Sequence, residues 1–412
     1  MLLNQPRARE IMKRENFDAL LAMLPINVYY LSDYWGLFNT PVGYDAAYMA
    51  LFPREEVLDS ALIIPALELR RTRTKGTWMP ELYAFSTEEK RIFDNKGVAK
   101  GMNYSGWRSR EGANLSELEK SWVEIVDLHG GDVAANAFWA MTRAIKTAGL
   151  ESGRVVTDDP RLSEWLKECG LKDIKCEYRA DIFNEIRLVK TPDEIALMRT
   201  AAIINENALL AATDALQVGA SWKEIENIYM QSIAEQGGRG IYLMCGVGEL
   251  PHRKVRLGEP IMLDALGQFE HYHGDFGRCA ILGEPTKEHY DRHAAICFGW
   301  KEAQNYLKPG TCYSEISMAV GQAIRDAGFI GFRDPIVHSL GLEHTDDPKM
   351  PGVQPQEKPN QNLVEGMVVN VDMPFTELGW GSVHMEDTVL ITSEGCERLG
   401  NSNFDLIVIE PK

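Results

Sequence analysis

The sequence has little that would place it in a membrane, on a nucleic acid or in an oxidising compartment. Its seven cysteines are an odd number and none forms a CxxC pair, which is typical of reduced thiols rather than a disulfide framework. Lys and Arg total 43 against 60 Asp and Glu, so no nucleic acid or anionic membrane partner is expected. No apolar run approaches the ~20 residues that a membrane helix needs.

Targeting and low-complexity segments are also missing. The first residues, MLLNQPRAREIMKREN, lack the charged start, apolar middle and small-residue cleavage site of a signal peptide. The first half has no internal repeat and no phosphate loop. These absences predict a soluble cytoplasmic protein, and 412 residues are enough for two domains with separate cores.

The most informative stretch present is IMLDALGQFEHYHGDFGR, in which an apolar strand ends on Asp264 and a second acid follows at Asp275. A hairpin centred between Phe269 and Glu270 would set these acids directly opposite each other, about 5 Å apart. Phe-Glu is a poor two-residue turn, so Gly267 indicates a bulge as the alternative. Two acids this close cannot both ionise cheaply without a cation.

A second acid pair follows the same pattern. Asp372 and Glu386 are equidistant from Gly379, so a turn there would place them opposite each other. Between the two pairs, His338 follows another short apolar run. Four carboxylates and one imidazole suit Mn²⁺, Fe²⁺, Co²⁺ or Zn²⁺, and two divalent ions would balance the four charges. The set has the composition of a bridged two-metal hydrolytic site.

Before about residue 180, helix-like and strand-like segments alternate, which predicts a mixed or parallel sheet covered by helices. Helices are expected over residues 8–16 and 133–146. Strands are expected over residues 19–24, 29–31, 47–52, 61–65 and 154–157. The polar segment 90–112 is expected to be an exposed excursion.

A helix is predicted to begin at Thr191, because Thr191-Pro192-Asp193-Glu194 is a capping box with Pro at the first helical position. Further helices are expected over 222–235, 287–307 and 314–327, covering a strongly curved antiparallel sheet. Every candidate metal ligand lies after this helix start.

The five donors occur in an order that resembles the pita-bread metallohydrolase family, which contains methionine aminopeptidase, proline aminopeptidase, prolidase and creatinase: Asp264, Asp275, His338, Asp372 and Glu386. The segments DALLAMLPINVYYLSDYWG and IRLVKTPDEIALMR are similar to the starts of that family's creatinase-type N-terminal domain and catalytic domain. The resemblance implies an α+β protein with a creatinase-like α/β N-terminal domain, 1–184, and a pita-bread catalytic domain, 185–412.

The resemblance also implies a role for each donor. Asp264 would bind one ion, Asp275 and Glu386 would bridge both ions, and His338 and Asp372 would complete the second ion's shell.

His252 matches the family histidine that faces the substrate. With His344 it would hold a tetrahedral oxyanion, while Glu343 or a metal-bridging acid would move the proton.

Three positions depart from the family pattern. Asp372 stands where the family has Glu. The family's second histidine falls on Thr345, one residue after His344, so either residue could take the substrate-side position. His384 replaces the Arg that the family's peptidases carry two residues before the last Glu, and strand parity places it on the face of Glu386.

The implied activity is dinuclear-metal-dependent hydrolysis of a peptide or amide C–N bond, similar to Xaa-Pro dipeptidases and aminopeptidases. A homodimer is implied as well, with the aromatic loop 34–44 as the crossing element. The altered substrate-facing positions leave a small-molecule enzyme of the same fold as an alternative: a creatinase-like or ectoine-hydrolase-like enzyme, or a metal-dependent sulfoniopropionate lyase. A catalytically silent binding module is the third possibility, although such proteins usually lose ligands and this chain keeps all five.

Overall fold

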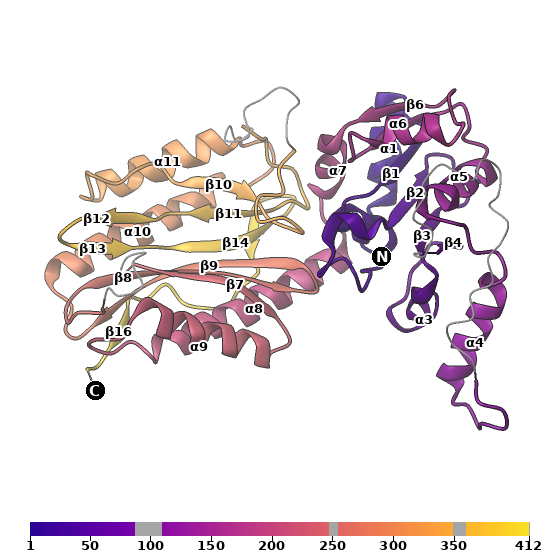
Figure 1. Cartoon of the computed structure of the whole chain (residues 1–412). Helices are drawn as coiled ribbons and strands as arrows, with labels where there is room; N and C mark the ends of the chain where they lie inside the picture. The colour runs from indigo at the N-terminus through magenta and orange to yellow at the C-terminus, as the bar shows by residue number, and fades with distance from the viewer. Residues whose placement is uncertain (87–108, 247–253, 349–359, 412) are drawn as a thin grey trace. The chain divides into compact units, whose positions relative to one another are not determined.

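A computed structural model describes residues 1–86, 109–246, 254–348 and 360–411 of the protein. Contacts between Cα atoms divide the chain into two compact units, Met1–Ile186 and Arg187–Lys412 (Figure 1).

The first unit is built on a six-stranded mixed sheet in the order β4-β3-β2-β1-β5-β6. Its strands are β1 Ala19–Ala22, β2 Met49–Pro53, β3 Ala61–Pro65, β4 Glu81–Phe85, β5 Arg154–Thr157 and β6 Lys175–Tyr178. Its helices are α1 Gln5–Glu15, α2 Pro25–Ser32, α3 Arg71–Lys75, α4 Glu117–His129, α5 Ala137–Thr147, α6 Leu162–Glu168 and α7 Ala180–Arg187, with short 3₁₀ turns at Gly43–Ala46 and Ala66–Glu68. The helix–strand alternation expected from the sequence is present.

One element of this unit was predicted wrongly. Residues 29–31, expected as a strand, lie inside helix α2. Pro25 presets the helical φ of the first turn, and Asp33 ends the helix in the left-handed conformation with φ of 60°. Every residue from Asn27 to Ser32 is buried, so the helix has no polar face whose period could have revealed it.

The second unit contains an eight-stranded, largely antiparallel sheet in the order β10-β11-β14-β9-β8-β7, with β15 added to β14 and β16 pairing parallel to β9. Its strands are β7 Arg239–Cys245, β8 Pro260–Phe269, β9 Tyr272–Leu282, β10 Ile336–Ser339, β11 Val368–Asp372, β14 Glu386–Ile391, β15 Cys396–Arg398 and β16 Ile407–Ile409. A separate two-stranded sheet joins β12 Phe375–Glu377 to β13 Gly381–Val383.

Four helices cover this sheet: α8 Pro192–Thr213, α9 Trp222–Glu235, α10 Lys287–Tyr306 and α11 Tyr313–Asp326. Helices α8 and α9 share a core with β7, β8 and β9, whereas α10 and α11 pack with β11 and β14 (Figure 1). The sheet residues in these cores alternate along the strands, for example Leu263 and Ala265, or Val369 and Val371. The intervening residues therefore point to the other face, where the acids lie.

Helix α8 begins as predicted. The Thr191 side chain accepts a hydrogen bond from the Glu194 backbone N–H, and the Glu194 side chain accepts one from the Thr191 backbone N–H. Within the described residues, α8 is the one helix long and apolar enough to cross a membrane by length and composition, and 50% of its most apolar window is buried inside the structure. Such burial is typical of a core helix.

The two acid hairpins differ in how well the sequence predicted them. Asp372 does pair directly with Glu386, as expected. The register of the first hairpin was predicted wrongly, because its turn is Glu270-His271, with φ of 44° and 71°. Asp264 is therefore opposite Gly277 rather than Asp275. The two acids are diagonal neighbours on the same face, and the irregularity in register lies on β7 instead of at Gly267.

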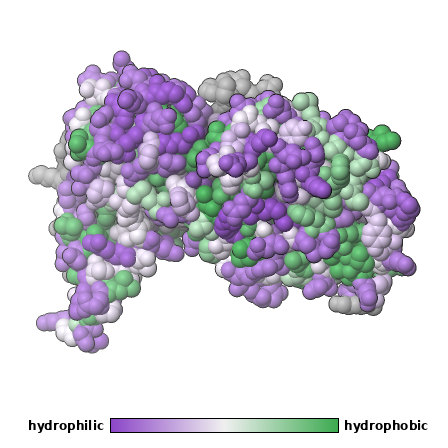
Figure 2. Space-filling view, turned by 180° about the vertical axis from the view of Figure 1, so that it is seen from behind, coloured by the Kyte–Doolittle hydropathy of each residue, from purple (hydrophilic) through white to green (hydrophobic). Residues whose placement is uncertain are grey.

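The visible surface of each unit mixes hydrophilic and hydrophobic residues (Figure 2). Figure 2 shows purple, hydrophilic residues over most of the visible face of each unit, with green, hydrophobic residues in separate groups. The formal net charge of the chain is −17.

Replacing Thr191 with Ala should lower the free energy of unfolding by about 1 kcal/mol, because the cap's hydrogen bond to a backbone N–H is lost. Urea unfolding measures the change. Thr200→Ala is the control, since Thr200 is half-buried in the middle of α8 and its Oγ1 donates to the Ala196 carbonyl, not to a cap. Equal stability of Thr191→Ala and the parent protein would contradict the capping role.

Candidate metal centre

The acids of the second unit lie in two adjacent rows that cross the sheet from strand to strand. Residues directly opposite each other on neighbouring strands share a face, so the pairing of the strands gives the members of each row. The first row is Met244, Asp264, Gly277, Glu386, Asp372 and Ile336. The second row, two residues along each strand, is Tyr242, Leu266, Asp275, Thr388, Asn370 and His338, with Thr388 Oγ1 donating to the Asp275 carbonyl. All five expected ligands are therefore on one face.

Two histidines approach Asp275, which is 2% exposed. His344 Nε2 lies 3.1 Å from Asp275 Oδ2, and His338 Nε2 lies 3.9 Å from the same oxygen. The two imidazole rings are 4.9 Å apart between centroids. His338 Nδ1 faces the Ser339 carbonyl at 3.1 Å, which directs Nε2 toward the acids. The structure thus brings His344, rather than Thr345, to Asp275.

The other acid pair has its own polar contacts. His384 Nε2 lies 2.7 Å from Asp372 Oδ1 and 3.6 Å from Glu386 Oε2, and its side chain is fully buried. Asn370 Nδ2 donates to Glu386 Oε1 at 3.0 Å. Gly277 makes room for His384, because a Cβ at position 277 would overlap the imidazole ring.

These donors fit a cation. The ligand-capable atoms form two groups, Asp275 with His338 and His344, and Asp264 with His384 and Glu386, with all atoms of a group within 4.8 Å of one another. Oδ1 of Asp264 is buried and has no hydrogen-bond partner among the described residues. Unpaired buried carboxylate oxygens are costly unless a cation binds them.

The electrostatics of the site lead to the same conclusion. Burial, together with the charges of Asp275 and Asp372, raises the pKa of Glu386 well above its usual range. Burial also raises the pKa of Asp264 to about 6, although the charge of His384 opposes this. Burial acts in the same direction on Asp275, but the hydrogen bond from His344 and the charge of His338 outweigh it, so the pKa of Asp275 is lowered. Without a metal, the site therefore holds extra protons, and a divalent ion would replace them.

Glu343 lies in a loop that a buried ion-pair network fixes. Arg187 Nη2 is 2.5 Å from Glu343 Oε2 and donates to Asp346 Oδ1 at the same distance. Lys190 Nζ donates to Asp346 Oδ2 at 3.1 Å, and both cations are almost fully buried. Burial would raise the pKa of Asp346, but the charges of Arg187 and Lys190 lower it. This network holds the loop that carries His344.

One predicted site residue, His252, lies outside the described residues.

Two residues near the acids were not predicted. Asn370 and Tyr242 belong to the second row, yet no motif in the sequence singled them out. Burial and the charges of Asp264 and Asp275 raise the pKa of Tyr242, which places its hydroxyl in the field of the acids. The only available signal was strand parity, since Asn370 stands two residues before Asp372.

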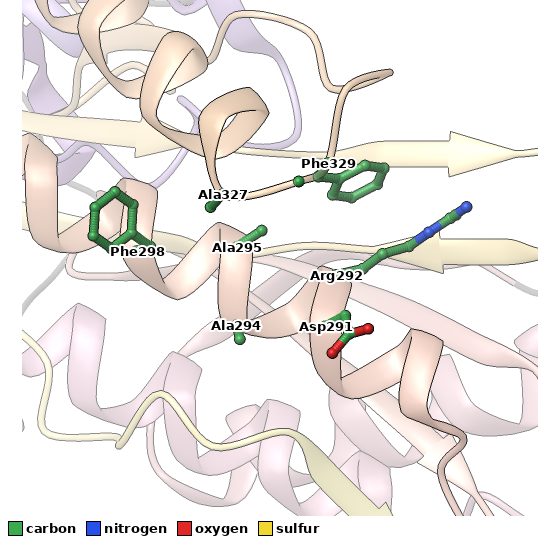
Figure 3. Close-up of a pocket in the computed structure, with 8 residues that line it drawn as sticks. Asp291, Arg292, Ala294, Ala295, Phe298, Ala327 and Phe329 are labelled. Carbon is green, nitrogen blue, oxygen red and sulfur yellow. The ribbon is translucent and has the colours of Figure 1, made fainter.

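The acid rows are not part of the pocket between α10 and the end of α11 (Figure 3). That cavity has a volume of about 440 Å³ and is lined largely by Ala and Phe side chains. Its two charged residues are engaged elsewhere: Asp291 pairs with Lys287, and Arg292 pairs with Glu288 and Glu377. The chemistry of the second unit therefore lies on the acid face of the sheet.

A curved sheet with a buried centre of acids and histidines defines a metal-dependent hydrolase. Residues 196–393 match the profile of metallopeptidase family M24, and residues 5–102 match the creatinase/prolidase N-terminal domain. The second unit belongs to metallopeptidase family M24, the pita-bread metallohydrolases, and the first unit carries the creatinase-type N-terminal domain. The family and the class of activity expected from the sequence, metal-dependent hydrolysis of a C–N bond, are confirmed.

Several relatives extend this likeness over most of the chain. The Xaa-Pro dipeptidase of Pyrococcus horikoshii is 25% identical over 281 residues, which cover 66% of this chain and 77% of that protein. The structure of an Xaa-Pro dipeptidase from Bacillus anthracis has a TM-score of 0.71 at 18% identity, covering 98% of this chain and 99% of the other. The prolidase structure from Pyrococcus horikoshii OT3 has a TM-score of 0.66 at 20% identity, with coverage of 98% and 99%. At these identities the structural comparisons establish the fold.

The metal-free protein should lose stability as the pH rises from about 4 to about 6, because Asp264 has a pKa of about 6 when folded against 3.8 as its ordinary value. In that window the native state binds more protons than the unfolded state, so ionisation penalises folding, by about 3 kcal/mol at most. Asp264→Asn should remove this part of the pH dependence.

Urea unfolding across this pH range, with a chelator present, measures the effect. Asp291→Asn is the control, because Asp291 is an exposed residue of α10 that pairs with Lys287 and belongs to neither acid row. An identical pH slope in Asp264→Asn and the parent protein would contradict the assignment.

Proposed function

We propose that the centre binds two divalent ions and hydrolyses short peptides or related small amides. The proposed ligands are the five expected donors: Asp264, Asp275, His338, Asp372 and Glu386. Asp275 and Glu386 would bridge the ions, since each belongs to one of the two donor groups and both approach His338 Nε2 at 3.9 Å. The observation that carries the proposal is the burial of Asp275 and Glu386, together with the buried Oδ1 atoms of Asp264 and Asp275 that have no hydrogen-bond partner among the described residues.

Divalent ions in such a set polarise a scissile carbonyl and supply a hydrolytic nucleophile at neutral pH. The identity of the ions is proposed only as Mn, Fe, Co or Zn, because oxygen and imidazole donors suit all four. The protein residues would hold the ions at fixed positions on the rigid sheet, and the positive charge of the ions would keep the buried acids ionised.

His344 is proposed to face the substrate. Its side chain is 43% exposed, whereas those of His338 and His384 are almost completely buried. A partly exposed imidazole beside Asp275 can donate a hydrogen bond to the substrate oxygen that gains negative charge. His252 is proposed for the same task from the segment before β8.

Proton transfer is better assigned to a bridging acid than to Glu343. The Glu343 carboxylate is held by Arg187, and the pair is part of a buried network with Asp346. A carboxylate that a buried guanidinium holds in place is not free to turn toward a substrate. Glu343 is therefore proposed to hold the loop of His344, with Asp275 or Glu386 moving the proton.

An Xaa-Pro substrate class is supported by the names of the relatives, but His384 argues for a modified specificity. Its imidazole is fully buried and its Nε2 is bound to Asp372, so it cannot offer a substrate carboxylate the two parallel donors of an arginine. A small amide or amidine substrate is the second candidate, for the same reason. A homodimer, with the 34–44 loop as the crossing element, and a cytoplasmic location complete the proposal.

Asp264→Ala, Asp275→Ala and Glu386→Ala should each abolish metal binding and turnover while the fold persists, because each removes a charge that the ions balance. Metal loading should raise the melting temperature of the parent protein and not that of the variants, since an ion that binds only the native state stabilises it. Elemental analysis, thermal unfolding and turnover of an Xaa-Pro dipeptide panel measure these effects. Full activity of chelator-treated parent protein would overturn the proposal.

His384→Arg should raise kcat/KM for simple Xaa-Pro dipeptides by roughly tenfold to a hundredfold, the value of one charged hydrogen bond. Arginine keeps a donor for Asp372 and adds a planar fork that grips a substrate carboxylate. The parent protein should turn over these dipeptides weakly. Efficient dipeptide turnover by the parent protein, unchanged in His384→Ala, would rule out position 384 as the specificity determinant.

A further inference from the structure

Two hydrogen bonds cross between the strands that carry Asp372 and Glu386. Asn370 stands two residues before Asp372, and its Nδ2 donates to Glu386 Oε1 at 3.0 Å. His384 stands two residues before Glu386, and its Nε2 lies 2.7 Å from Asp372 Oδ1. Each acid thus has a hydrogen-bonding partner two residues before the other acid.

The register of the sheet produces this crossing. Asp372 and Glu386 are directly opposite each other, so residues two positions earlier on either strand are their diagonal neighbours on the same face. Asn370 lies between Thr388 and His338 in the second row. His384 precedes β14 and lies over Gly277, where the missing side chain leaves space for the ring.

Neither donor residue is fully satisfied. Asn370 is 0% exposed and His384 is 1% exposed, yet Asn370 Oδ1 and His384 Nδ1 have no hydrogen-bond partner among the described residues. A buried polar atom without a partner costs stability, and an apolar side chain would avoid that cost. What each polar residue provides in return is one hydrogen-bond donor for an acid. This indicates that both residues serve to orient the acids.

We propose that Asn370 and His384 are a crossed pair of positioning residues for the metal centre, an inference that rests on the proposed function. Each residue occupies one oxygen of the acid on the other strand. Asp372 Oδ2 and Glu386 Oε2 are left outside these two bonds, and Glu386 Oε1, 3.9 Å from His338 Nε2, keeps a second lone pair for an ion. The pair fixes the rotation of both carboxylates before an ion arrives.

The consequence is that metal affinity depends on two side chains that do not themselves bind metal. Residues that hydrogen-bond a ligating carboxylate typically change metal affinity by 10- to 100-fold when they are replaced.

The test compares the dissociation constant for Mn²⁺, measured by competition with a chelating indicator, in matched variants. His384→Phe keeps a flat ring without a donor, and Asn370→Leu keeps the volume without a donor. Both should weaken Mn²⁺ binding by roughly tenfold or more. His384→Gln returns a donor and should recover affinity to within about threefold of the parent protein.

Asn27→Leu is the control for the Asn substitution. Asn27 is 4% exposed in the first unit and donates to the buried Asp158 Oδ2 at 2.8 Å. The variant should unfold more easily while its Mn²⁺ affinity stays that of the parent protein.

The absorption spectrum of the Co²⁺-loaded protein separates positioning from direct ligation. The ligand-field bands should be the same in His384→Gln and the parent protein, and altered bands would place His384 in the ion's own shell and overturn the inference. Unchanged Mn²⁺ affinity in His384→Phe and Asn370→Leu would overturn it as well, while leaving the two-metal proposal intact. A parent protein that binds no ion would overturn both.

Discussion

Carboxylates buried side by side repel one another, and this constraint shapes the catalytic unit. Asp264, Asp275 and Glu386 share one face of the sheet, with Asp372 next to them. In the metal-free protein, the pKa of Glu386 rises because of burial and the charges of Asp275 and Asp372. The surrounding structure keeps these acids together at a cost in stability that bound cations would offset.

The rest of the unit holds this arrangement in place. Arg278 donates to the carbonyls of Gly277 and Glu386, which secures the seam where β9 meets β14. On the other side, Arg187 and Lys190 clamp Asp346 and so fix the loop of His344. The helices pack against the opposite face of the sheet and form the hydrophobic cores there. The sheet is therefore held rigid by that face, and the acid face does not have to provide apolar packing.

The sequence predicted those features that depend on local pattern. Gly379 lies midway between Asp372 and Glu386, and a turn there gave the correct register. The register of the first hairpin was predicted wrongly because Glu270 and His271 adopt positive φ, although neither is a typical residue for such a turn. Helix α2 was not predicted because residues Asn27 to Ser32 are all buried, which leaves no polar face to reveal a helical period.

Contacts between distant residues could not be predicted from pattern at all. Arg187 meets Glu343 across 156 positions, and nothing local distinguishes Glu343 as a structural acid from a catalytic one. Asn370 is an ordinary polar residue in a Val-rich strand, and its bond to Glu386 follows only from the register of two strands. The ligand roles and the role of His252 stay predictions.

The central claim, that the acid face holds two ions joined by shared carboxylates, is tested most directly by electron paramagnetic resonance. Metal-free protein would be reconstituted with two equivalents of Mn²⁺ per chain and measured at low temperature. The account predicts the spectrum of an exchange-coupled pair, because bridging carboxylates connect the two spins. A spectrum of isolated Mn²⁺ alone, or of free Mn²⁺ in solution, would contradict it.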